Sequence, residues 1–334
     1  MKRLGKTTAN FTGAIIILLV SMVLGVMHGP THISLHTVLA RLISPNHSID
    51  SVIIWQIRLP AVVASATVGG GLAVSGAVMQ ALLKNPLADP YIVGASAGAG
   101  LGATLAQEFL PFMNLMAPAA FIGSLIAVFI SFLLAQGRGT SRMLTLILAG
   151  YAVGVIFTSV TTFLMLLNRQ TLSSIFAWEV GGINGVTWTQ IAVSLSLILI
   201  SLLVIWPLAP EMNALLLGEE QAHHLGVPVR RVQFILLAAA SLLAAAAVYI
   251  SGLIGFVGLV IPHIVRRING PNHRRLLPLS FLVGAGFLAL ANIVAQSIPV
   301  IGPIPVGLIT ACLGGPYFLF LLVRQNRWNG GWSP

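Results

Sequence analysis

The sequence predicts an all-α membrane protein of about ten transmembrane helices per subunit, with an inverted internal repeat and both termini in the cytoplasm. Three observations lead to this fold class. The chain of 334 residues is 57% hydrophobic and only 7% charged. Long apolar stretches recur along its whole length, and its basic residues gather in alternate connecting loops. Soluble domains carry roughly 25% charged residues, so a soluble fold of this composition would lack a polar surface.

Ten stretches are apolar enough to cross a bilayer, for which a helix needs about 20 mostly apolar residues. They cover residues 11–27, 60–83, 91–107, 117–136, 143–167, 189–207, 233–250, 254–268, 276–296 and 305–323. The first follows a basic start, as in a signal peptide, but no convincing small-x-small cleavage site follows it. We therefore expect it to be retained, and we expect residues 1–334 to form one transmembrane domain.

Three polar connectors separate these stretches, at 28–58, 168–188 and 208–232. In the first, the spacing of Ile33, Val38, Leu39 and Leu42 predicts a short surface helix. In the third, the segment "GEEQAHHLG" predicts a short helix that ends at Gly226.

The turn "KNPLADPYIVGASAGAG", residues 84–100, joins the second and third stretches. Asp89 suits a helix N-cap and Pro90 suits the first helical turn, so the pair should start the next helix. Gly94, Gly98 and Gly102 then follow at helical spacing, which predicts the close approach of another helix.

Basic residues indicate the orientation of the helices. With a cytoplasmic N-terminus, 14 of the 17 Lys and Arg residues fall on the cytoplasmic side, and only Arg41, Arg58 and Arg169 fall on the other side. This asymmetry follows the positive-inside rule and supports ten spans with both termini inside.

A short internal repeat is also visible. Ser75-Gly76, Pro86 and Gly94 recur 176 residues later as Ser251-Gly252, Pro262 and Gly270. This offset moves each span five places along the chain, so the two halves would run in opposite directions through the membrane.

The polar residues exclude several classes of protein. All seven acidic residues lie in predicted loops or at span ends, namely Asp50, Asp89, Glu108, Glu179, Glu211, Glu219 and Glu220. A carboxylate in mid-bilayer usually marks a proton or cation relay, so an ion-coupled carrier is disfavoured. There is no GxxxxGK[ST] phosphate loop and no hydrolase constellation, so we expect no enzymatic activity and no cofactor.

Other chemistries are also disfavoured. His28, His32 and His36 have helical spacing that could suit a metal, but Pro30 interrupts it, so no metal site is expected. The net charge of +10 is scattered between apolar stretches, which argues against nucleic acid. His263 is expected to bond the backbone carbonyl that Pro262 leaves free.

Four stretches resemble the FecCD-type permeases, which are membrane subunits of ATP-binding-cassette (ABC) importers for iron-siderophores, haem and cobalamin. They are "RLPAVVASATVGGGLAVSGAVMQALLKNPLADPYIVGASAGAGLGA" (58–103), "LLLGEEQAHHLGVPVRRV" (215–232), "SGLIGFVGLVIPHIVRRINGPNHRRLLPLS" (251–280) and "IPVGLITACLGGPYFLFLL" (304–322). They occur in the family's order and span almost the whole chain.

The resemblance implies a permease in the bacterial inner membrane that works by alternating access as a homodimer. Its pathway would follow the two-fold axis, two ATPase subunits would bind its cytoplasmic face, and an external binding protein would deliver the cargo. Iron-siderophore is the expected cargo, with haem and cobalamin as alternatives. An ion-coupled secondary transporter and a non-transporting membrane scaffold are the competing interpretations.

The resemblance also implies roles for particular residues. The loop with Gly218, Glu219, Ala222, Leu225 and Gly226 resembles the helices that couple these permeases to their ATPases.

Asn85, Leu87 and the turn at Thr140-Ser141 match residues that narrow the cytoplasmic end of the pathway. Arg58 matches an outer arginine that docks the binding protein, although an interfacial anchor would explain it as well. A second docking stretch reads "ANIVAQ" here, and Asn292 and Gln296 leave it without charge.

Overall fold

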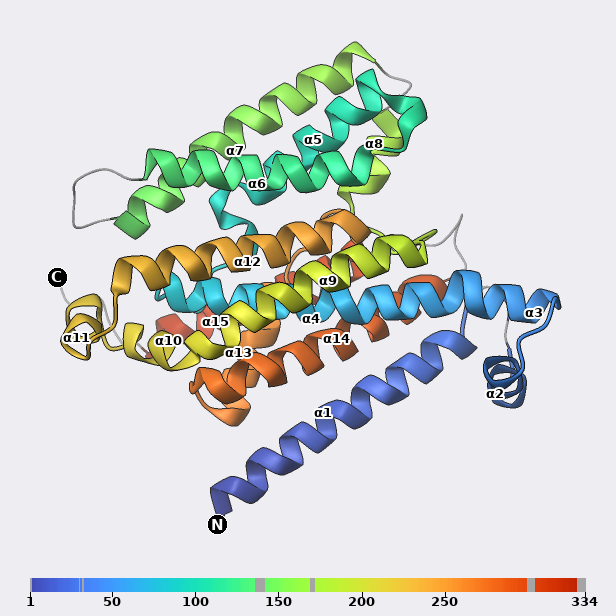
Figure 1. The fold of residues 1–334 in the computed structure, drawn as a ribbon, viewed down its shortest axis with the longest axis horizontal. Helices are drawn as coiled ribbons and strands as arrows, with labels where there is room; N and C mark the ends of the chain where they lie inside the picture. The colour runs from blue at the N-terminus through green and yellow to red at the C-terminus, as the bar shows by residue number, and fades with distance from the viewer. Residues whose placement is uncertain are drawn as a thin grey trace.

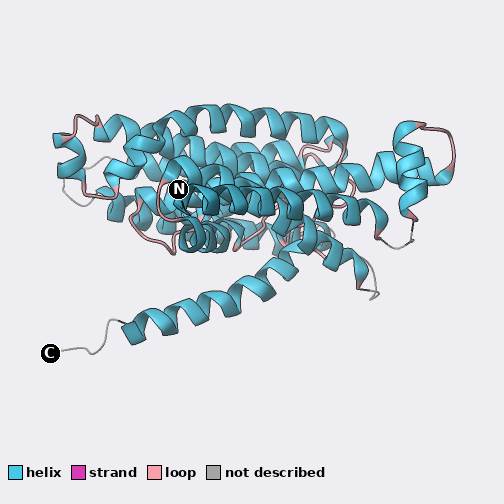
Figure 2. Ribbon diagram, turned by 90° about the horizontal axis from the view of Figure 1, so that it is seen from below, coloured by secondary structure: helices cyan, strands magenta, loops and turns pink. Residues whose placement is uncertain are grey.

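The computed structural model describes residues 2–29, 31, 33–135, 142–168, 172–298 and 304–328, and all regular structure in these ranges is helical (Figure 2). Each of the ten predicted spans contains a helix, so the predicted all-α, multi-helix fold class is confirmed, whereas the cytoplasmic position of both termini stays a prediction. The ten are α1 (Lys2–Met27), α4 (Leu59–Leu82), α5 (Ala95–Phe109), α6 (Met116–Leu134), α7 (Arg142–Leu167), α9 (Trp188–Ile205), α12 (Val229–Ser251), α13 (Val257–Asn269), α14 (His273–Ser297) and α15 (Val306–Trp328).

Seven segments of the described chain are long and apolar enough to cross a membrane. They contain α1, α4, α6, α7, α9, α12 and α14. Helices α5 and α13 have only 15 and 13 residues, so each rises about 20 Å, less than a hydrocarbon core of about 30 Å. The short 3₁₀ turn η2 (Pro90–Val93) lengthens the path of α5 at its start.

Short helices gather at the two ends of the bundle (Figure 1). At one end lie α2 (Leu35–Ile43), which confirms the predicted surface helix, α3 (Ile49–Val52), and the π-helical turn η1 (Ile53–Arg58) that runs into α4. At the other end lie η4 (Trp206–Leu208), α10 (Ala209–Leu215) and α11 (Glu219–His224).

Besides α3, η1, η4 and α10, two further short elements were not predicted. The turn η3 (Pro111–Met113) precedes α6, and the helix α8 (Leu172–Glu179) lies inside the connector that was expected to be a polar loop.

Helix α4 forms the centre of the larger group of helices and packs against α9, α12, α13 and α14. Nearly all its side chains are buried. A side chain at Gly69 would clash with the backbone of Gly284 in α14, and one at Gly76 would clash with the backbone of Gly258 in α13. These glycines let the backbones approach closely, as small residues do between membrane helices.

Helices α5, α6, α7 and α8 form a second group, which lies on α12 in Figure 1. A side chain at Gly98 would clash with Gly123 of α6, and one at Gly102 with Ala119, so the predicted close approach is confirmed at these two positions. Gly94 has a different role from the one predicted. Its φ of 88° is left-handed, and it ends η2 beside Gly150 of α7.

The four matched positions of the internal repeat are not structurally equivalent, so that correspondence is wrong. Pro86 lies in a turn while Pro262 lies inside α13, and Gly94 precedes α5 while Gly270 follows α13. The inverted relation between the two halves of the chain stays a prediction.

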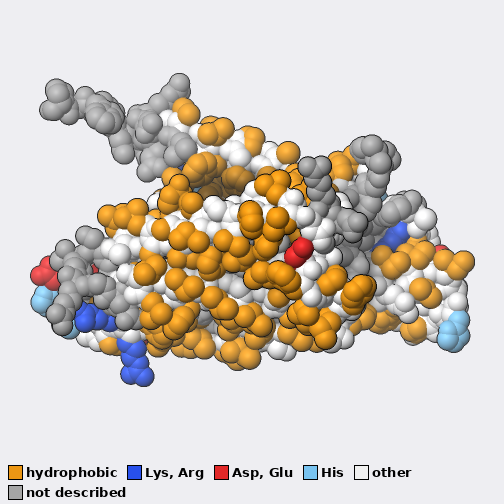
Figure 3. All heavy atoms as spheres, turned by 90° about the horizontal axis from the view of Figure 1, so that it is seen from above, with side chains coloured by type: hydrophobic (Ala, Val, Ile, Leu, Met, Phe, Trp, Pro, Cys, Tyr) orange, Lys and Arg blue, Asp and Glu red, His pale blue; other side chains and the backbone are white. Residues whose placement is uncertain are grey.

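Apolar side chains cover the middle of the molecule, and charged and histidine side chains gather mainly at its two ends (Figure 3). This distribution matches a bundle that stands in a membrane with its short end helices in the headgroup regions.

Candidate functional site

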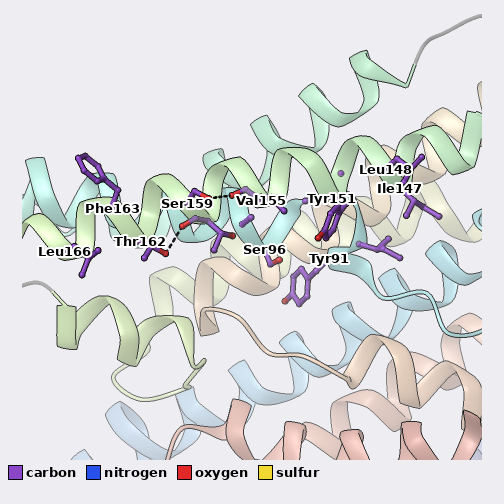
Figure 4. A pocket seen from close by; sticks show the side chains of 16 residues that line it. Tyr91, Ser96, Ile147, Leu148, Tyr151, Val155, Ser159, Thr162, Phe163 and Leu166 are labelled. Carbon is purple, nitrogen blue, oxygen red and sulfur yellow. Dashed lines mark hydrogen bonds between the residues drawn. The ribbon is translucent and has the colours of Figure 1, made fainter.

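A groove of about 920 Å³ runs along one face of α7, facing η2 and the start of α5 (Figure 4). Its walls are mostly aliphatic and aromatic, and none of the described residues that line it carries a charge. The lining residues are Tyr91, Ile92, Gly94, Ser96, Ala97, Ile147, Leu148, Gly150, Tyr151, Gly154, Val155, Thr158, Ser159, Thr162, Phe163 and Leu166.

The hydroxyls on this face of α7 are bonded to their own helix. Ser159 Oγ donates to the carbonyl of Val155 at 2.8 Å, and Thr162 Oγ1 donates to that of Thr158 at 2.9 Å. Such bonds satisfy the hydroxyl protons without a partner from outside the helix. The groove therefore offers a large, weakly polar surface on which an organic cargo can move without a strong fixed contact.

The face of α7 along the groove is uncovered by the rest of the chain. Tyr151 is 72% exposed and Phe163 is 60% exposed, although both lie in a membrane helix. Leu148, Tyr151, Val155, Thr162 and Leu166 recur at intervals of three, four and seven, which places them on one side of a helix. Sequence reasoning did not single out these residues, although this spacing was visible.

The predicted gate turn lies directly beside the groove. Asn85 Oδ1 accepts a hydrogen bond from the amide of Leu87 at 2.9 Å, and Lys84 adopts a left-handed φ of 48°. Asp89 caps η2 as predicted, because its Oδ1 accepts from the amide of Tyr91 at 2.9 Å. Asn85 is exposed and Leu87 half-buried at the tip of the turn. Thr140 and Ser141, the other half of the predicted gate, lie outside the described residues.

Asp89 is partly buried in the turn between α4 and η2. Burial raises its pKa to about 6, and the bond from the Tyr91 amide opposes this rise. The ionised carboxylate of Asp89 therefore lowers the stability of the folded protein near neutral pH.

Gln80, near the C-terminus of α4, joins that helix to α13, a contact that sequence reasoning missed. Its Nε2 donates to the carbonyls of Gly258, at 3.4 Å, and Leu259, at 3.1 Å. Pro262 has no amide proton, so the carbonyl of Gly258 lacks its usual helical donor. The predicted partner was His263, and that prediction is wrong, because neither ring nitrogen of His263 has a hydrogen-bond partner.

The side-chain oxygen of Gln80 binds Arg266. Gln80 Oε1 accepts from Arg266 Nη2 at 3.0 Å, and Gln80 is only 2% exposed. The side chain of Gln80 thus links α4 to two parts of α13, namely the carbonyls that precede Pro262 and the guanidinium of Arg266.

The predicted coupling loop forms a compact, exposed turn of helix. Gly218 and Gly226 flank α11 with φ of 128° and 81°, so both ends use conformations that favour glycine. Ala222 is fully buried and anchors α11, whereas Leu225 is 64% exposed. Glu219 Oε1 accepts from Gln233 Nε2 of α12 at 2.9 Å. The loop is therefore fixed to α12 while presenting an apolar side chain outward.

Arg58 lies at the opposite end and is only 4% exposed. Its guanidinium donates to the carbonyls of Val26 and Met27 at 2.9 and 2.7 Å, and also to the carbonyl and hydroxyl of Thr31. It therefore caps the C-terminus of α1. Docking of a binding protein by Arg58 stays a prediction, and it would require the side chain to give up these bonds.

One acid reaches further into the bundle than its sequence position indicates. Glu179 ends α8, and its carboxylate lies against Gly100, part-way along α5, where a side chain would collide with it at 2.7 Å. The expectation that every acid stays at a span end is therefore wrong for the carboxylate of Glu179.

Comparison with known proteins agrees with this architecture. The sequence profile of the FecCD transport family matches residues 17–324. The cobalamin import system permease protein BtuC of Halobacterium salinarum is 45% identical over 81% of the chain and 73% of that protein. The hemin transport system permease protein HmuU of Yersinia pestis is 41% identical over 83% of the chain and 85% of that protein.

A solved structure has the same fold. It is described as an inward-facing conformation of a metal-chelate type ABC transporter, and it superposes with a TM-score of 0.81 at 29% identity. The superposition covers 95% of the chain and 99% of that structure.

Proposed function

The chain belongs to the FecCD transport family, and from this premise we propose that it moves a large metal chelate along the α7 groove by alternating access. As a multi-pass permease subunit of an ABC importer in the inner membrane, it is not an enzyme, and ATP is hydrolysed by separate ATPase subunits. The observation that carries the proposal is the groove, which is large, is lined by uncharged residues and includes Tyr91 and Ile92, the residues that follow the gate turn in the chain.

The cargo that fits this groove best is a metal-bound macrocycle of the cobalamin or haem class. Two similar permeases are named for cobalamin and for hemin. Tyr91 and Tyr151 offer aromatic faces to a flat, partly apolar ring system. No relative reported above is named for an iron-siderophore, so that expectation from the sequence has no further support.

A second copy of the chain would complete the pathway. The uncovered face of α7 is apolar and aromatic, as a surface buried between protomers would be. Two grooves facing each other across a two-fold axis would enclose the cargo, which one open groove cannot do.

In this arrangement the end that carries α11 faces the cytoplasm, as the distribution of basic residues predicts. Two ATPase subunits would dock on α11, and a binding protein would deliver cargo at the opposite end. Leu87, at the tip of the gate turn, would close the cytoplasmic end of the pathway together with Asn85.

Reconstitution with the cognate ATPase and binding protein tests the proposal. We expect cobalamin or haem uptake into proteoliposomes that requires ATP. Leu87→Trp should abolish uptake by blocking the path while dimer and ATPase still co-purify. The competing interpretation is an ion-coupled carrier, and uptake by the permease alone under an ion gradient would establish it instead.

A further inference from the structure

A second pocket, which shares no lining residue with the groove, lies at the α11 end of the bundle. Its volume is about 280 Å³, and it lies between the end of α6, the start of α7 and the start of α12. Its lining residues are Phe132, Ala135, Met143, Leu146, Arg230, Arg231, Gln233, Phe234 and Leu237.

The pocket is divided into a basic mouth and an apolar interior. Arg230 and Arg231 lie in the first turn of α12 and are exposed, and within the described chain neither forms an ion pair with an acid. Leu237 lies six to seven residues further along the helix, about 10 Å deeper. The rings of Phe132 and Phe234 pack at a tilt of 49° with their centroids 5.1 Å apart, and both line the pocket.

A basic mouth above an apolar interior matches the structure of a phospholipid. A phospholipid places its phosphate at the membrane surface and its acyl chains in the hydrocarbon just below. Basic pockets between transmembrane helices on the cytoplasmic side are suited to anionic headgroups. We propose that this pocket binds an anionic phospholipid, with the headgroup phosphate on Arg230 and Arg231 and an acyl chain between Phe132, Met143 and Leu237.

The pocket is linked to the predicted ATPase docking loop. Gln233 lines the pocket, and its amide holds the carboxylate of Glu219 at the start of α11. A lipid in the pocket would therefore fix the end of α12 that positions α11. This consequence for coupling rests on the proposed function, whereas lipid binding itself does not.

Native mass spectrometry of the purified full-length chain tests the binding. Detergent-solubilised protein is incubated with dioleoyl phosphatidylglycerol or with dioleoyl phosphatidylcholine. We expect preferential retention of phosphatidylglycerol, weakened about thirtyfold in Arg230→Gln/Arg231→Gln, since each arginine at the surface contributes about a fivefold gain for an anionic lipid. Arg274→Gln/Arg275→Gln removes an equal charge from the start of α14 and should retain the lipid.

A second pair of variants tests the acyl site without changing charge. Met143→Trp should fill the pocket and displace the lipid. Leu144→Trp is the matched control, because Leu144 is the next residue, is 57% exposed and does not line the pocket.

Two results would overturn the proposal. Equal retention of phosphatidylglycerol by the wild type and the Arg230/Arg231 variant would show that the arginines do not hold the headgroup. Full competition by inorganic phosphate, with no effect of Met143→Trp, would show a simple anion site in place of a lipid site. Unchanged ATPase coupling in a variant that has lost the lipid would instead contradict the consequence drawn for α11, without affecting the lipid site itself.

Discussion

At the scale of single residues, Gln80 shows how a proline can be kept inside a short membrane helix. Pro262 removes the donor for the carbonyl of Gly258, and Gln80 supplies two donor contacts from the neighbouring helix. An unsatisfied carbonyl in a membrane interior costs several kcal/mol, so this one side chain replaces what the helix lost.

Gln80→Leu should lower the stability of the protein by about 2–3 kcal/mol, because it leaves the carbonyl of Gly258 and the guanidinium of Arg266 without their partner. Thermal unfolding in detergent measures this. In a Pro262→Ala background the new amide proton can bond Gly258, so the same substitution should cost about 1 kcal/mol less. An identical cost in both backgrounds would show that Gln80 does not act through the proline.

Asp89→Asn should stabilise the protein at neutral pH and have little effect at pH 4. The folded-state pKa of Asp89 is about 6, above its ordinary value of 3.8, so ionisation opposes folding increasingly as pH rises between the two values, and the cost is then constant at higher pH. Asparagine keeps the Oδ1 acceptor for the Tyr91 amide and removes the charge. Melting temperatures from pH 4 to 8 should diverge as pH rises, and a constant difference would refute the electrostatic cost.

At the scale of elements, the proposed gate and the proposed docking loop are both built on short pieces of helix that end at a glycine. Gly94 lets η2 turn into α5 next to α7, and Gly218 and Gly226 let α11 stand out from the bundle. Short elements with left-handed ends can be placed at an angle to the long helices, which is what a gate and a docking loop require.

Leu225→Asp should reduce co-purification of the ATPase strongly while leaving the permease folded. Leu225 is 64% exposed, so the change costs little within the subunit, but it places a charge in the centre of an apolar contact. Leu39→Asp is a suitable control, because Leu39 is 51% exposed on α2 at the opposite end. Equal ATPase recovery from both variants would exclude Leu225 from the docking surface.

The sequence predicted elements better than it predicted contacts. The ten helices, the Asp89 cap and the α11 turn follow from local patterns of hydropathy, capping residues and glycine. Local patterns could not predict the donor to the carbonyl that Pro262 leaves free. Gln80 is 182 residues from Pro262 in the sequence, and only the packing of α4 on α13 brings them together. The groove was missed because α7 is apolar on every side. The composition of α7 therefore does not show which of its faces packs against other helices and which stays open.

At the scale of the whole molecule, the two groups of helices have different roles in the proposed function. The helices around α4 form the rigid, closely packed group, and α5 to α8 form a second group that carries the groove. The gate turn and Gly94 join the two groups, so relative movement between them would open and close the cytoplasmic end of the path. In the proposed function, transport would also need a second protomer and ATPase subunits docked at α11.

The most direct test of the groove as the transport pathway is ATP-driven cobalamin or haem uptake by two tryptophan variants on opposite faces of α7. Thr158→Trp places an indole in the groove, whereas Ile156→Trp places one at a residue that is 59% exposed but does not line the groove. Both are measured in proteoliposomes with the ATPase and the binding protein. We predict that Thr158→Trp reduces uptake to background while Ile156→Trp retains it, and wild-type uptake by Thr158→Trp would contradict the assignment of the groove as the pathway.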